Sequence, residues 1–389
     1  LLKAVKKIGA GDLSDGLATA IHQLKHIDGK KVASVSDYKA VFSHLKSLPV
    51  EPDESKLFQA DVYRSYERCE LSQDRVDRLL KQLMLLKSLS VSPNNTFEDF
   101  IRKFNSRYEG QLVQLDKLLD DESGISFSND TGYESKLLAG LNIARSRGGN
   151  SQAPQTSLLD SIISTEITSP KNKTKQTIKL KSKELKQQVK SNALDESIPA
   201  SFAAMFALYE DENKNSLVKF KGCYGPSAAN LLGRFCHLDE GLENAVKTHL
   251  KREEELSPDV IFAEVVHMPE GRPGNVIARP HLRQYEIVFM ADSSLDSEYQ
   301  IPVSDLFVWV ESGKVKLWSK RLQKQVVPRL SSAHNYSARS LSVYKFLCML
   351  QGQSGRAPSF ELPVSLRLAS FVPRIMLDDL ILSEKIWRI

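Results

Sequence analysis

The chain has 389 residues, of which 41% are hydrophobic and 26% charged, and its formal net charge is +5. This length allows two or three domains with separate cores, and the composition is typical of a globular protein. No run of about 18 apolar residues is present, which argues against a membrane-spanning helix. The net charge is too mild to indicate nucleic-acid binding by itself, so local clusters of charge matter more.

The four cysteines are widely separated and form no pattern of metal ligands with histidine. We therefore expect no structural zinc site and no other metal site. Disulfides are also not expected in so large a chain with so few cysteines, and reduced thiols indicate a cytosolic protein.

Apolar residues at helical spacing predict that residues 1–147 are mainly helical. Helices are expected to begin at or near Ser14, Ser36, Ser72 and Thr96. The alternating segment 57–63 predicts one strand that enters this helical layer.

Residues 148–197 differ in composition and predict an insertion or linker. Eight lysines and a single acid, Glu184, occupy the stretch from Lys171 to Lys190. This stretch is either a solvated, mobile insertion, which we favour, or a polybasic arm that contacts RNA phosphates. Residues Thr177 to Leu185 are expected to form a strand and a short helix at the edge of the next domain.

Residues 198–389 predict a mixed region of helices and strands. The expected elements are strands from Phe202 and over 259–266, a hairpin of 306–310 with 315–319, and helices over 242–252 and 340–350. Residues 380–382 and 387–389 resemble paired strands that are cut short. The predicted fold class is α+β: a helical first part, then a mixed, largely antiparallel β-sheet region with packed helices, truncated at its end.

Basic residues cluster on the strands that follow residue 315. They are Lys316, Lys320, Arg321, Lys324 and Arg329, with no acid among them. Aliphatic residues and Trp318 alternate with these charges, so we expect strands with one basic face. His334 lies in the turn that follows. It is either a structural histidine that fixes the turn, which we favour, or a proton-transfer group.

Two further groups of charges are candidate site residues. Asp120, Asp121 and Glu122 follow a predicted helix, where their charge opposes the helix dipole. They are either solvated carboxylates or a cluster with one carboxylate aimed into a site. The second group consists of arginines on or near predicted strands: Arg234, Arg283 and Arg374. Such arginines either clamp a carboxylate or phosphate or are surface charges.

An ordered series of segments closely resembles the amino-terminal domain of class I lanthipeptide (lantibiotic) dehydratases. The segments are LFQADVYR (57–64), FNSRYEGQLVQLDKLLDDESGI (104–125), IPASFAAMFALY (198–209), YGPSAANLLGRF (224–235), NVIARPHLRQYEI (275–287), IPVSDLFVWV (301–310), KLWSKRLQKQVVPRLSSAHN (316–335), YKFLCMLQ (344–351) and FVPRIMLDDLILS (371–383). The resemblance extends from about residue 13 to 389 and is weakest over 126–197. A series of this length is more specific than any single short motif.

The resemblance implies an enzyme component that transfers glutamate from glutamyl-tRNA to Ser and Thr of a precursor peptide. Glutamate is then eliminated, leaving dehydroalanine or dehydrobutyrine. Glutamyl-tRNA is the co-substrate and no cofactor is implied. Implied partners are the precursor peptide and the tRNA, with a lanthipeptide cyclase, a transporter and a second copy of the chain as further candidates. The implied location is cytoplasmic, with peripheral membrane association through a biosynthetic complex as an additional expectation.

Two alternatives remain open. One is a non-catalytic tRNA- or peptide-binding scaffold derived from the same domain. The other is a stand-alone glutamylation component whose eliminase is a separate chain.

By this resemblance, Asp121 and Arg374 match family positions needed for glutamylation, although a slip of one residue would select Asp120 instead. The candidate contacts for tRNA or substrate are Arg234, Arg283, Lys316, Lys320, Arg321, Lys324, Arg329 and His334. The family's early Lys/Ser/Arg-rich segment is not found. A leader-binding module is expected before Leu1 and an elimination domain beyond Ile389. The sequence thus resembles a middle portion of the glutamylation domain, inactive by itself.

Overall fold

The computed structural model describes most of the chain. The described residues are 2–30, 32–46, 48, 53, 58–62, 67, 69–89, 97–127, 157–189, 198–268, 274–336 and 340–388. They fall into two compact units, Leu1–Tyr66 and Glu67–Ile389. The domain boundaries predicted at 147 and 197 lie outside the described residues.

The first unit is helical. Its helices are α1 (Leu2–Lys7), α2 (Gly11–Asp28) and α3 (Val35–Leu45). α3 begins with a capping box between Ser34 and Asp37. The Lys30 ammonium lies 2.7 Å from Asp37 Oδ1. This hydrogen bond, with those from Ser34, lowers the pKa of Asp37 to about 2.

The strand predicted over 57–63 is wrong for its described residues, 58–62, which form no strand. The Phe58 ring packs edge-on against Tyr38 of α3, with 5.1 Å between centroids. Val62 is 90% exposed, so the alternating pattern has no sheet face to cover.

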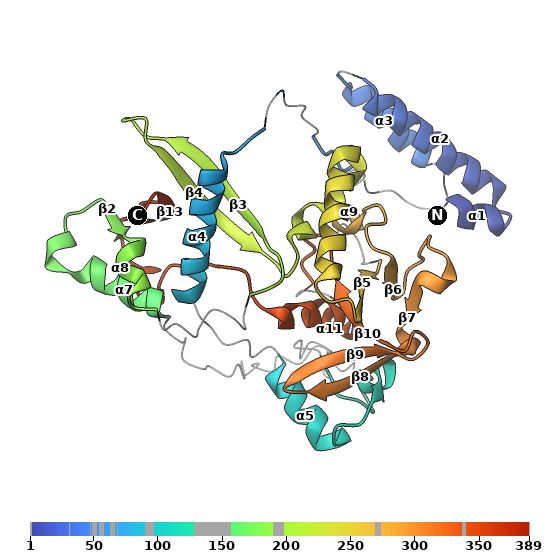
Figure 1. The fold of residues 1–389 in the computed structure, drawn as a ribbon. Coiled ribbons are helices and arrows are strands. Elements are labelled where there is room, and N and C mark those ends of the chain that lie inside the picture. Colours follow the sequence, from blue (N-terminus) through green and yellow to red (C-terminus); the bar gives the residue numbers. More distant parts are fainter. Residues whose placement is uncertain are drawn as a thin grey trace, which may run out of the picture. The chain divides into compact units, whose positions relative to one another are not determined.

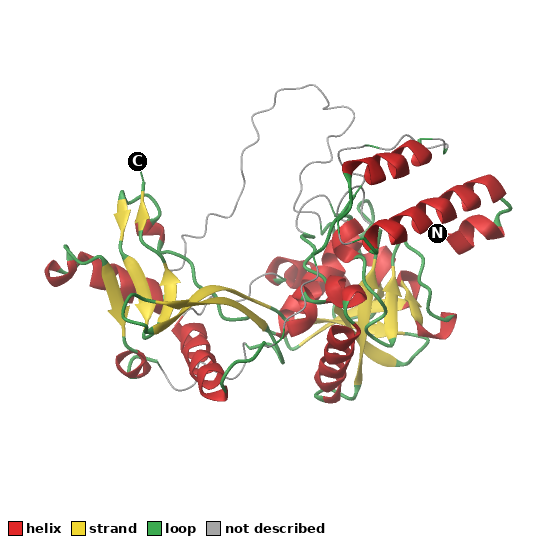
Figure 2. Cartoon of the chain, turned by 90° about the horizontal axis from the view of Figure 1, so that it is seen from above, coloured by secondary structure: helices red, strands yellow, loops and turns green. Residues whose placement is uncertain are grey.

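The second unit contains two mixed sheets, seen as separate groups of strands in Figures 1 and 2. Sheet A has the order β1-β8-β9-β10-β5-β6-β7. Its strands are β1 (Val113–Gln114), β8 (Leu306–Glu311), β9 (Lys314–Ser319), β10 (Lys324–Arg329), β5 (Val260–Val266), β6 (Tyr285–Val288) and β7 (Gln300–Pro302). The predicted hairpin is present as β8 and β9, which pair antiparallel.

Helices cover sheet A. They are α5 (Glu98–Tyr108), α6 (Leu115–Leu118), α9 (Glu240–Glu255) and α11 (Ser342–Leu350). The short α10 (Gly274–Ile277) lies between β5 and β6 along the chain. Phe104, Leu115 and Phe346 are fully buried in one core with the inward residues of the sheet. The helices predicted from Ser72 and Thr96, over 242–252 and over 340–350 are thus confirmed, as α4, α5, α9 and α11, with small shifts of their ends.

Sheet B has the order β2-β12-β13-β4-β3 and a core of its own. Its strands are β2 (Thr177–Leu180), β12 (Arg374–Leu377), β13 (Leu380–Ser383), β4 (Ser216–Tyr224) and β3 (Ala203–Glu210). The helices α4 (Gln73–Leu89), α7 (Leu158–Thr168) and α8 (Ser182–Lys186) pack on this core. A separate small ladder joins β11 (Phe371–Val372) to β14 (Ile386–Trp387).

The lysine-rich region carries the strand and helix predicted for it. β2 pairs parallel with β12, and Ile178, Leu180 and Leu185 are buried in the core of sheet B. The described part of this region is therefore folded onto the sheet by its apolar residues, while its lysines face outward.

The pairing predicted for the last two strands is wrong. β13 pairs with β12 and β4, and β14 pairs with β11. A tight turn at Asp378, whose φ of 52° is left-handed, folds β13 back onto β12. The other edge of β13 is then taken by β4. The predicted α+β class is confirmed, and its sheets combine antiparallel hairpins with parallel pairs. None of the described helices combines the length and apolar character needed to cross a membrane.

Candidate functional site

A cavity of about 740 Å³ lies among segments that follow β4 of sheet B and β10 of sheet A, with α11 forming another wall. Its cationic or titratable side chains include Lys345, Arg356 and His334. No aspartate or glutamate is among the described residues that line it. A cavity with positive groups and no acid favours an anionic ligand.

Lys345 is the least expected residue of this wall. It interrupts the apolar helix α11 and is only 8% exposed. Within the described parts of the chain, its ammonium makes no hydrogen bond or ion pair. A buried cation without a counter-ion is costly, and an anion bound in the cavity would offset that cost.

A second cation strengthens the positive potential. Lys87 of α4 is also buried, and burial together with the charge of Arg356 lowers its pKa. Arg356 lines the cavity and so brings a like charge close to Lys87. Lys87, from a helix that packs on sheet B, and the cavity residues Lys345 and Arg356 therefore place several cations in or near this cavity.

His334 lies in the cavity wall with its ring fixed. Its Nδ1 is 2.9 Å from the Tyr344 hydroxyl. Burial, and the nearby His267, lower the pKa of His334, so its neutral form is favoured at neutral pH. Its Nε2 has no hydrogen-bond partner among the residues that the structure describes. His334 thus ties its turn to Tyr344 of α11, while its other ring nitrogen remains available to a ligand.

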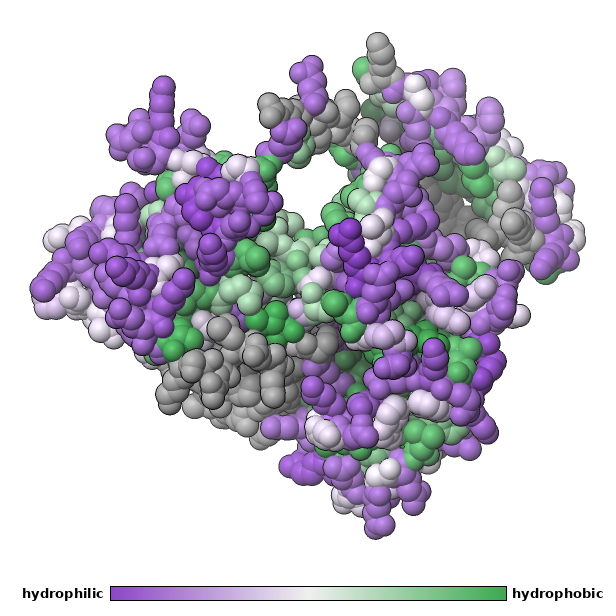
Figure 3. Space-filling view, in the orientation of Figure 1, coloured by the Kyte–Doolittle hydropathy of each residue, from purple (hydrophilic) through white to green (hydrophobic). Residues whose placement is uncertain are grey.

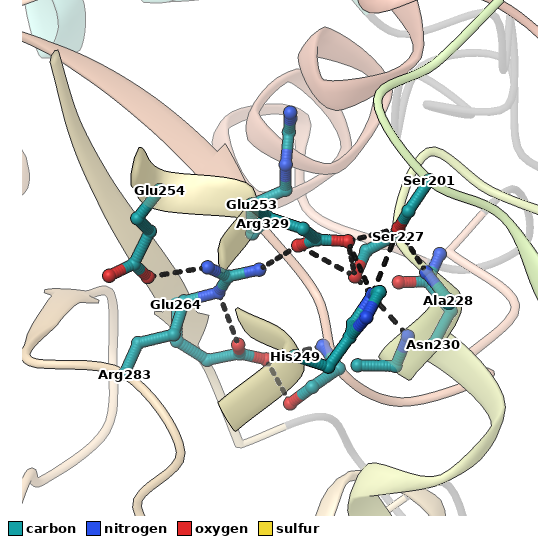
Figure 4. Close-up of polar contacts among 12 residues, drawn as sticks. Ser201, Ser227, Ala228, Asn230, His249, Glu253, Glu254, Glu264, Arg283 and Arg329 are labelled. Carbon is teal, nitrogen blue, oxygen red and sulfur yellow. Dashed lines mark hydrogen bonds and ion pairs between the residues drawn. The ribbon is translucent and has the colours of Figure 1, made fainter. Parts of the chain in front are cut away.

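A buried ionic network lies behind the cavity wall (Figure 4). The Arg283 side chain is 1% exposed and lies 2.6 Å from Glu254 Oε1 and 3.1 Å from Glu253 Oε2. Its Nε is 3.8 Å from Glu264 Oε2. Burial alone would raise the pKa of Glu253, but hydrogen bonds from Ser201 and Ser227 and the charge of Arg283 outweigh burial and lower it.

This network positions the cavity wall. Glu264 Oε1 accepts hydrogen bonds from the Ser331 backbone N–H at 2.6 Å and from its hydroxyl at 2.9 Å. Leu330 N–H donates to Gln351 Oε1 at 3.3 Å. At the Glu253 end of the network, the Ser227 hydroxyl donates to Glu253 Oε1 at 2.8 Å. The turn that carries His334 is thus held at its base by buried carboxylate and amide oxygens.

Residue 233 must be a glycine because the Ser331 carbonyl of this turn packs directly against its backbone. Its N–H donates to the Ser331 carbonyl at 3.0 Å. A Cβ at residue 233 would lie 2.1 Å from that oxygen, which is backbone and cannot swing aside. We expect Gly233→Ala to lower the free energy of unfolding by about 1–3 kcal/mol, as overpacking does. Gly352→Ala, where a Cβ would meet nothing within 4 Å, is the control in thermal unfolding. Equal stability of both variants would contradict the prediction.

Comparison with known proteins identifies the family. Residues 3–389 match the family described as lantibiotic dehydratase, N terminus. The chain belongs to this family. The resemblance inferred from the sequence segments is confirmed. A search of curated proteins found no match.

Three solved structures are similar to this chain to different degrees. The tRNA-dependent lantibiotic dehydratase MibB from Microbispora sp. 107891 is 15% identical with a TM-score of 0.72, over 97% of this chain and 36% of MibB. The chain thus has the MibB fold and spans about a third of its length. The glutamylation domain TbtB from thiomuracin biosynthesis is 13% identical, with a TM-score of 0.42, over 80% of this chain and 37% of TbtB. TbtB bound to 5'-phosphodesmethylglutamycin gives 15% identity, a TM-score of 0.45 and the same coverages.

Asp121, which the lantibiotic dehydratase family resemblance selects, is exposed after α6. Its neighbour Asp120 has a structural role. Asp120 Oδ1 accepts hydrogen bonds from the Ser123 hydroxyl and N–H, both at 2.7 Å, which lower its pKa. Arg107 donates to the Ser123 and Gly124 carbonyls at 2.7 and 2.9 Å. The turn is therefore firmly held through Asp120, and the carboxylates of Asp121 and Glu122 are exposed beside it.

Arg374, the other residue selected by the family resemblance, begins β12. Its Nε donates to Glu384 Oε2 at 3.0 Å, and Glu384 also lies 3.1 Å from Lys219 Nζ. Asp121 adjoins the core of sheet A, whereas Arg374 belongs to sheet B. Neither residue lines the 740 Å³ cavity. The structure does not bring the two together at this site, and their catalytic roles stay a prediction.

The predicted contact residues divide into buried and exposed groups. Arg283 and Arg329 are buried, and burial lowers the pKa of Arg329 to about 10. The Arg329 guanidinium stacks 5.1 Å from the ring centroid of Phe262. Arg234 lies beside Gly233, 4.8 Å from the ring centroid of Phe235. These three arginines lie near the buried network and the cavity wall.

The remaining predicted cations lie around the strands β8 to β10. Lys316 pairs with Glu311 and lies 5.7 Å from the ring centroid of Trp309. Arg321 donates to the Glu298 and Gln300 carbonyls at 3.0 and 2.7 Å. The other two cations, Lys320 and Lys324, are exposed. The predicted strands are present as β9 and β10, but the single basic face is wrong. Lys320 and Arg321 lie in the turn between the two strands, and Arg329 is buried. Contact of these cations with RNA stays a prediction.

Four site residues were missed by reasoning from the sequence: Lys345, Arg356, Glu253 and Glu264. Two of them carried a signal. Lys345 is a single cation in the apolar helix SVYKFLCML, and Glu264 is a single acid in the apolar strand VIFAEVV. A lone charge in an apolar element predicts a buried partner or a ligand.

Proposed function

We propose that this chain is part of an enzyme that transfers glutamate from glutamyl-tRNA to Ser and Thr hydroxyls of a precursor peptide. The observation that carries the proposal is the acid-free cavity lined by Lys345 and Arg356, in a chain of the lantibiotic dehydratase family. The fold shared with MibB, described as tRNA-dependent, supports the same activity. The substrate's carboxylate or terminal phosphate is the anion that such a cavity would hold.

The reaction would be an ester exchange. The Ser or Thr oxygen attacks the glutamyl carbonyl carbon, the bond from that carbon to the tRNA ribose oxygen breaks, and a new ester forms. Neutral His334 would accept the hydroxyl proton at Nε2 and return it to the departing ribose oxygen. Lys345 and Arg356 would stabilise the negative charge that develops on the carbonyl oxygen or would orient the substrate's anionic group.

The rest of the assignment is proposed from the family resemblance. We propose that glutamyl-tRNA is the co-substrate without a further cofactor, and that the protein is cytoplasmic. The precursor peptide is the second substrate, and a cyclase, a transporter and a second copy of the chain are candidate partners. Because the chain covers 36% of MibB, we expect no transfer from these residues alone.

The test uses the full-length protein with glutamyl-tRNA and its precursor peptide. Mass spectrometry is expected to detect glutamate added to Ser or Thr, or loss of water after elimination. If neither product is detected, although the protein is verified as folded and the tRNA as charged, the proposal is contradicted.

Asp121→Ala and Arg374→Ala are each expected to abolish this glutamylation, as the family resemblance implies. Both side chains are at least partly exposed, so the free energy of unfolding should change by less than about 1 kcal/mol. Arg374→Lys, which retains the charge beside Glu384, is the matched control. Retained transfer in either alanine variant, measured by mass spectrometry, would show that this residue is not needed for glutamylation.

The second candidate is a non-catalytic tRNA- or peptide-binding scaffold. The placement of Asp121 and Arg374 in different cores favours it. Binding of tRNA that weakens steeply with salt, with no transfer under any condition, would support this candidate.

A further inference from the structure

A second cavity, of about 840 Å³, lies beside sheet B and away from His334 and Lys345. It is lined by α4, β2, α8, the end of the β3–β4 loop and the β12–β13 turn. The bases that line it are Arg75, Arg78, Lys81, Lys179 and Lys186, which we call the α4–α8 basic surface. The lining acids are Asp211, Asp378 and Asp379.

The fold gathers these bases from distant parts of the sequence. Arg75, Arg78 and Lys81 recur every third residue and follow one side of α4, while Leu79, Leu83 and Leu86 of the same helix are buried in the core of sheet B. Lys179 lies between buried Ile178 and Leu180, so strand alternation turns it outward. The apolar residues that build the sheet therefore also place the five bases around one hollow.

Two of the three acids are already engaged in turns. Asp378 accepts hydrogen bonds from the Ser182 N–H at 3.1 Å and from its hydroxyl. Asp379 Oδ1 accepts one from Gln82 Nε2 at 2.5 Å. These carboxylates fix the cavity walls and do not form ion pairs with the five bases in the described chain.

The third acid is engaged in the same way. Asp211 accepts hydrogen bonds from the Asn215 side chain at 2.9 Å and backbone N–H at 2.8 Å, and these lower its pKa. On the basic side, Arg75 Nη1 is buried and has no hydrogen-bond partner among the described residues. Arg78 pairs with the exposed Asp74 at 3.0 Å. An unsatisfied arginine donor beside three engaged carboxylates points to an anionic ligand.

The positive charge continues beyond the cavity along the lysine-rich segment. Its further exposed lysines are Lys171, Lys173, Lys175, Lys181 and Lys183. Figure 3 shows hydrophilic residues over α4, α7 and α8 on this side of the molecule. A row of cations longer than one cavity matches a ligand with repeated negative charges. Leu217 and Met376 are the apolar residues of the lining, too few for insertion into a membrane.

We propose that the α4–α8 basic surface binds the phosphate backbone of an RNA, separately from the cavity that holds His334. The contacts are to phosphates and carry no sequence readout. The inference rests on the proposed function, in which that RNA is the tRNA of the glutamyl donor. The surface would hold the body of the tRNA and leave the 740 Å³ cavity for its aminoacylated end.

The experiment compares two charge-matched variants of the full-length protein. Arg78→Glu/Lys186→Glu alters the basic surface, and Arg252→Glu/Lys251→Glu alters exposed residues of α9 by the same charge. Binding of uncharged tRNA is measured by fluorescence anisotropy between low and moderate salt. The basic-surface variant is expected to bind at least about tenfold more weakly. The slope of log K against log salt concentration should fall in magnitude by roughly 1.8, because two phosphate contacts are lost and each contributes about 0.9. The α9 variant should match the unaltered protein.

Transfer kinetics separate this inference from the proposed function. The basic-surface variant is expected to show a raised KM for glutamyl-tRNA with unchanged kcat, because it touches no reacting group. Equal tRNA binding by both variants would overturn the inference while leaving glutamyl transfer intact. Binding of anionic vesicles in preference to tRNA would also overturn it. No binding and no transfer by the unaltered protein would overturn the proposed function itself.

Discussion

Replacing Lys345 by methionine is expected to slow glutamyl transfer by about 10- to 100-fold, the cost of losing one charge-assisted contact. The same change should leave the melting temperature unchanged or raise it. Lys345 is a buried cation without a carboxylate partner among the described residues, and methionine has a similar length and no charge to desolvate. Opposite effects on rate and stability are typical of a residue that serves a ligand.

Lys314→Met is the control for this prediction. Lys314 is exposed on β9, so its loss should change neither the rate nor the melting temperature. Single-turnover transfer and thermal unfolding are measured for both variants. A Lys345 variant that unfolds more easily and transfers glutamate at the normal rate would show that the ammonium serves the fold.

Replacing Arg283 by methionine is expected to lower the free energy of unfolding by about 3–5 kcal/mol, as loss of one partner from a buried ion network does. The guanidinium lies against Glu253, Glu254 and Glu264, and two of these carboxylates are almost fully buried. Without Arg283 the buried Glu253 loses its arginine partner, whereas Glu264 keeps Arg279, whose Nε lies 3.1 Å from Glu264 Oε1. Because the network anchors Ser331, we also expect the cavity wall to loosen and transfer to fall.

Denaturant unfolding measures this effect, with Arg367→Met as the control. Arg367 pairs with Glu361 at 2.8 Å on the surface, where loss of the pair should cost less than about 1 kcal/mol. The comparison also decides between two roles for Arg283. A stable variant with weakened tRNA binding would favour a direct contact with RNA and contradict the network's structural role.

Much of the secondary structure could be predicted because it follows from local patterns. Apolar spacing located α2, α3, α4, α5, α9 and α11, and alternation located the β8–β9 hairpin. The segment 57–63 has the same alternation but no sheet to join. The partners of the last strands depend on a turn at Asp378 and on β4, more than 150 residues away, which no local pattern encodes.

The candidate site was less predictable because its properties depend on which charges meet. Arg283 and Arg329 looked like free cations on strands, but acids from α9 and β5 lie beside them in three dimensions. Lys345, with no such acid, was hidden within an apolar helix. The sequence predicts that a charge is present, whereas the fold decides whether it is neutralised.

The strand order of sheet B has a consequence for synthesis of the protein on the ribosome. Its central strands, β12 and β13, are made last, and they separate β2 from β4. β4 ends at Tyr224 and β12 begins at Arg374, so 374 − 224 = 150 residues must be added before the sheet can close. At about 5–20 residues per second this takes roughly 8–30 s. During that interval the nascent chain carries unpaired edges of β2 and β4, which makes it a candidate client for a chaperone.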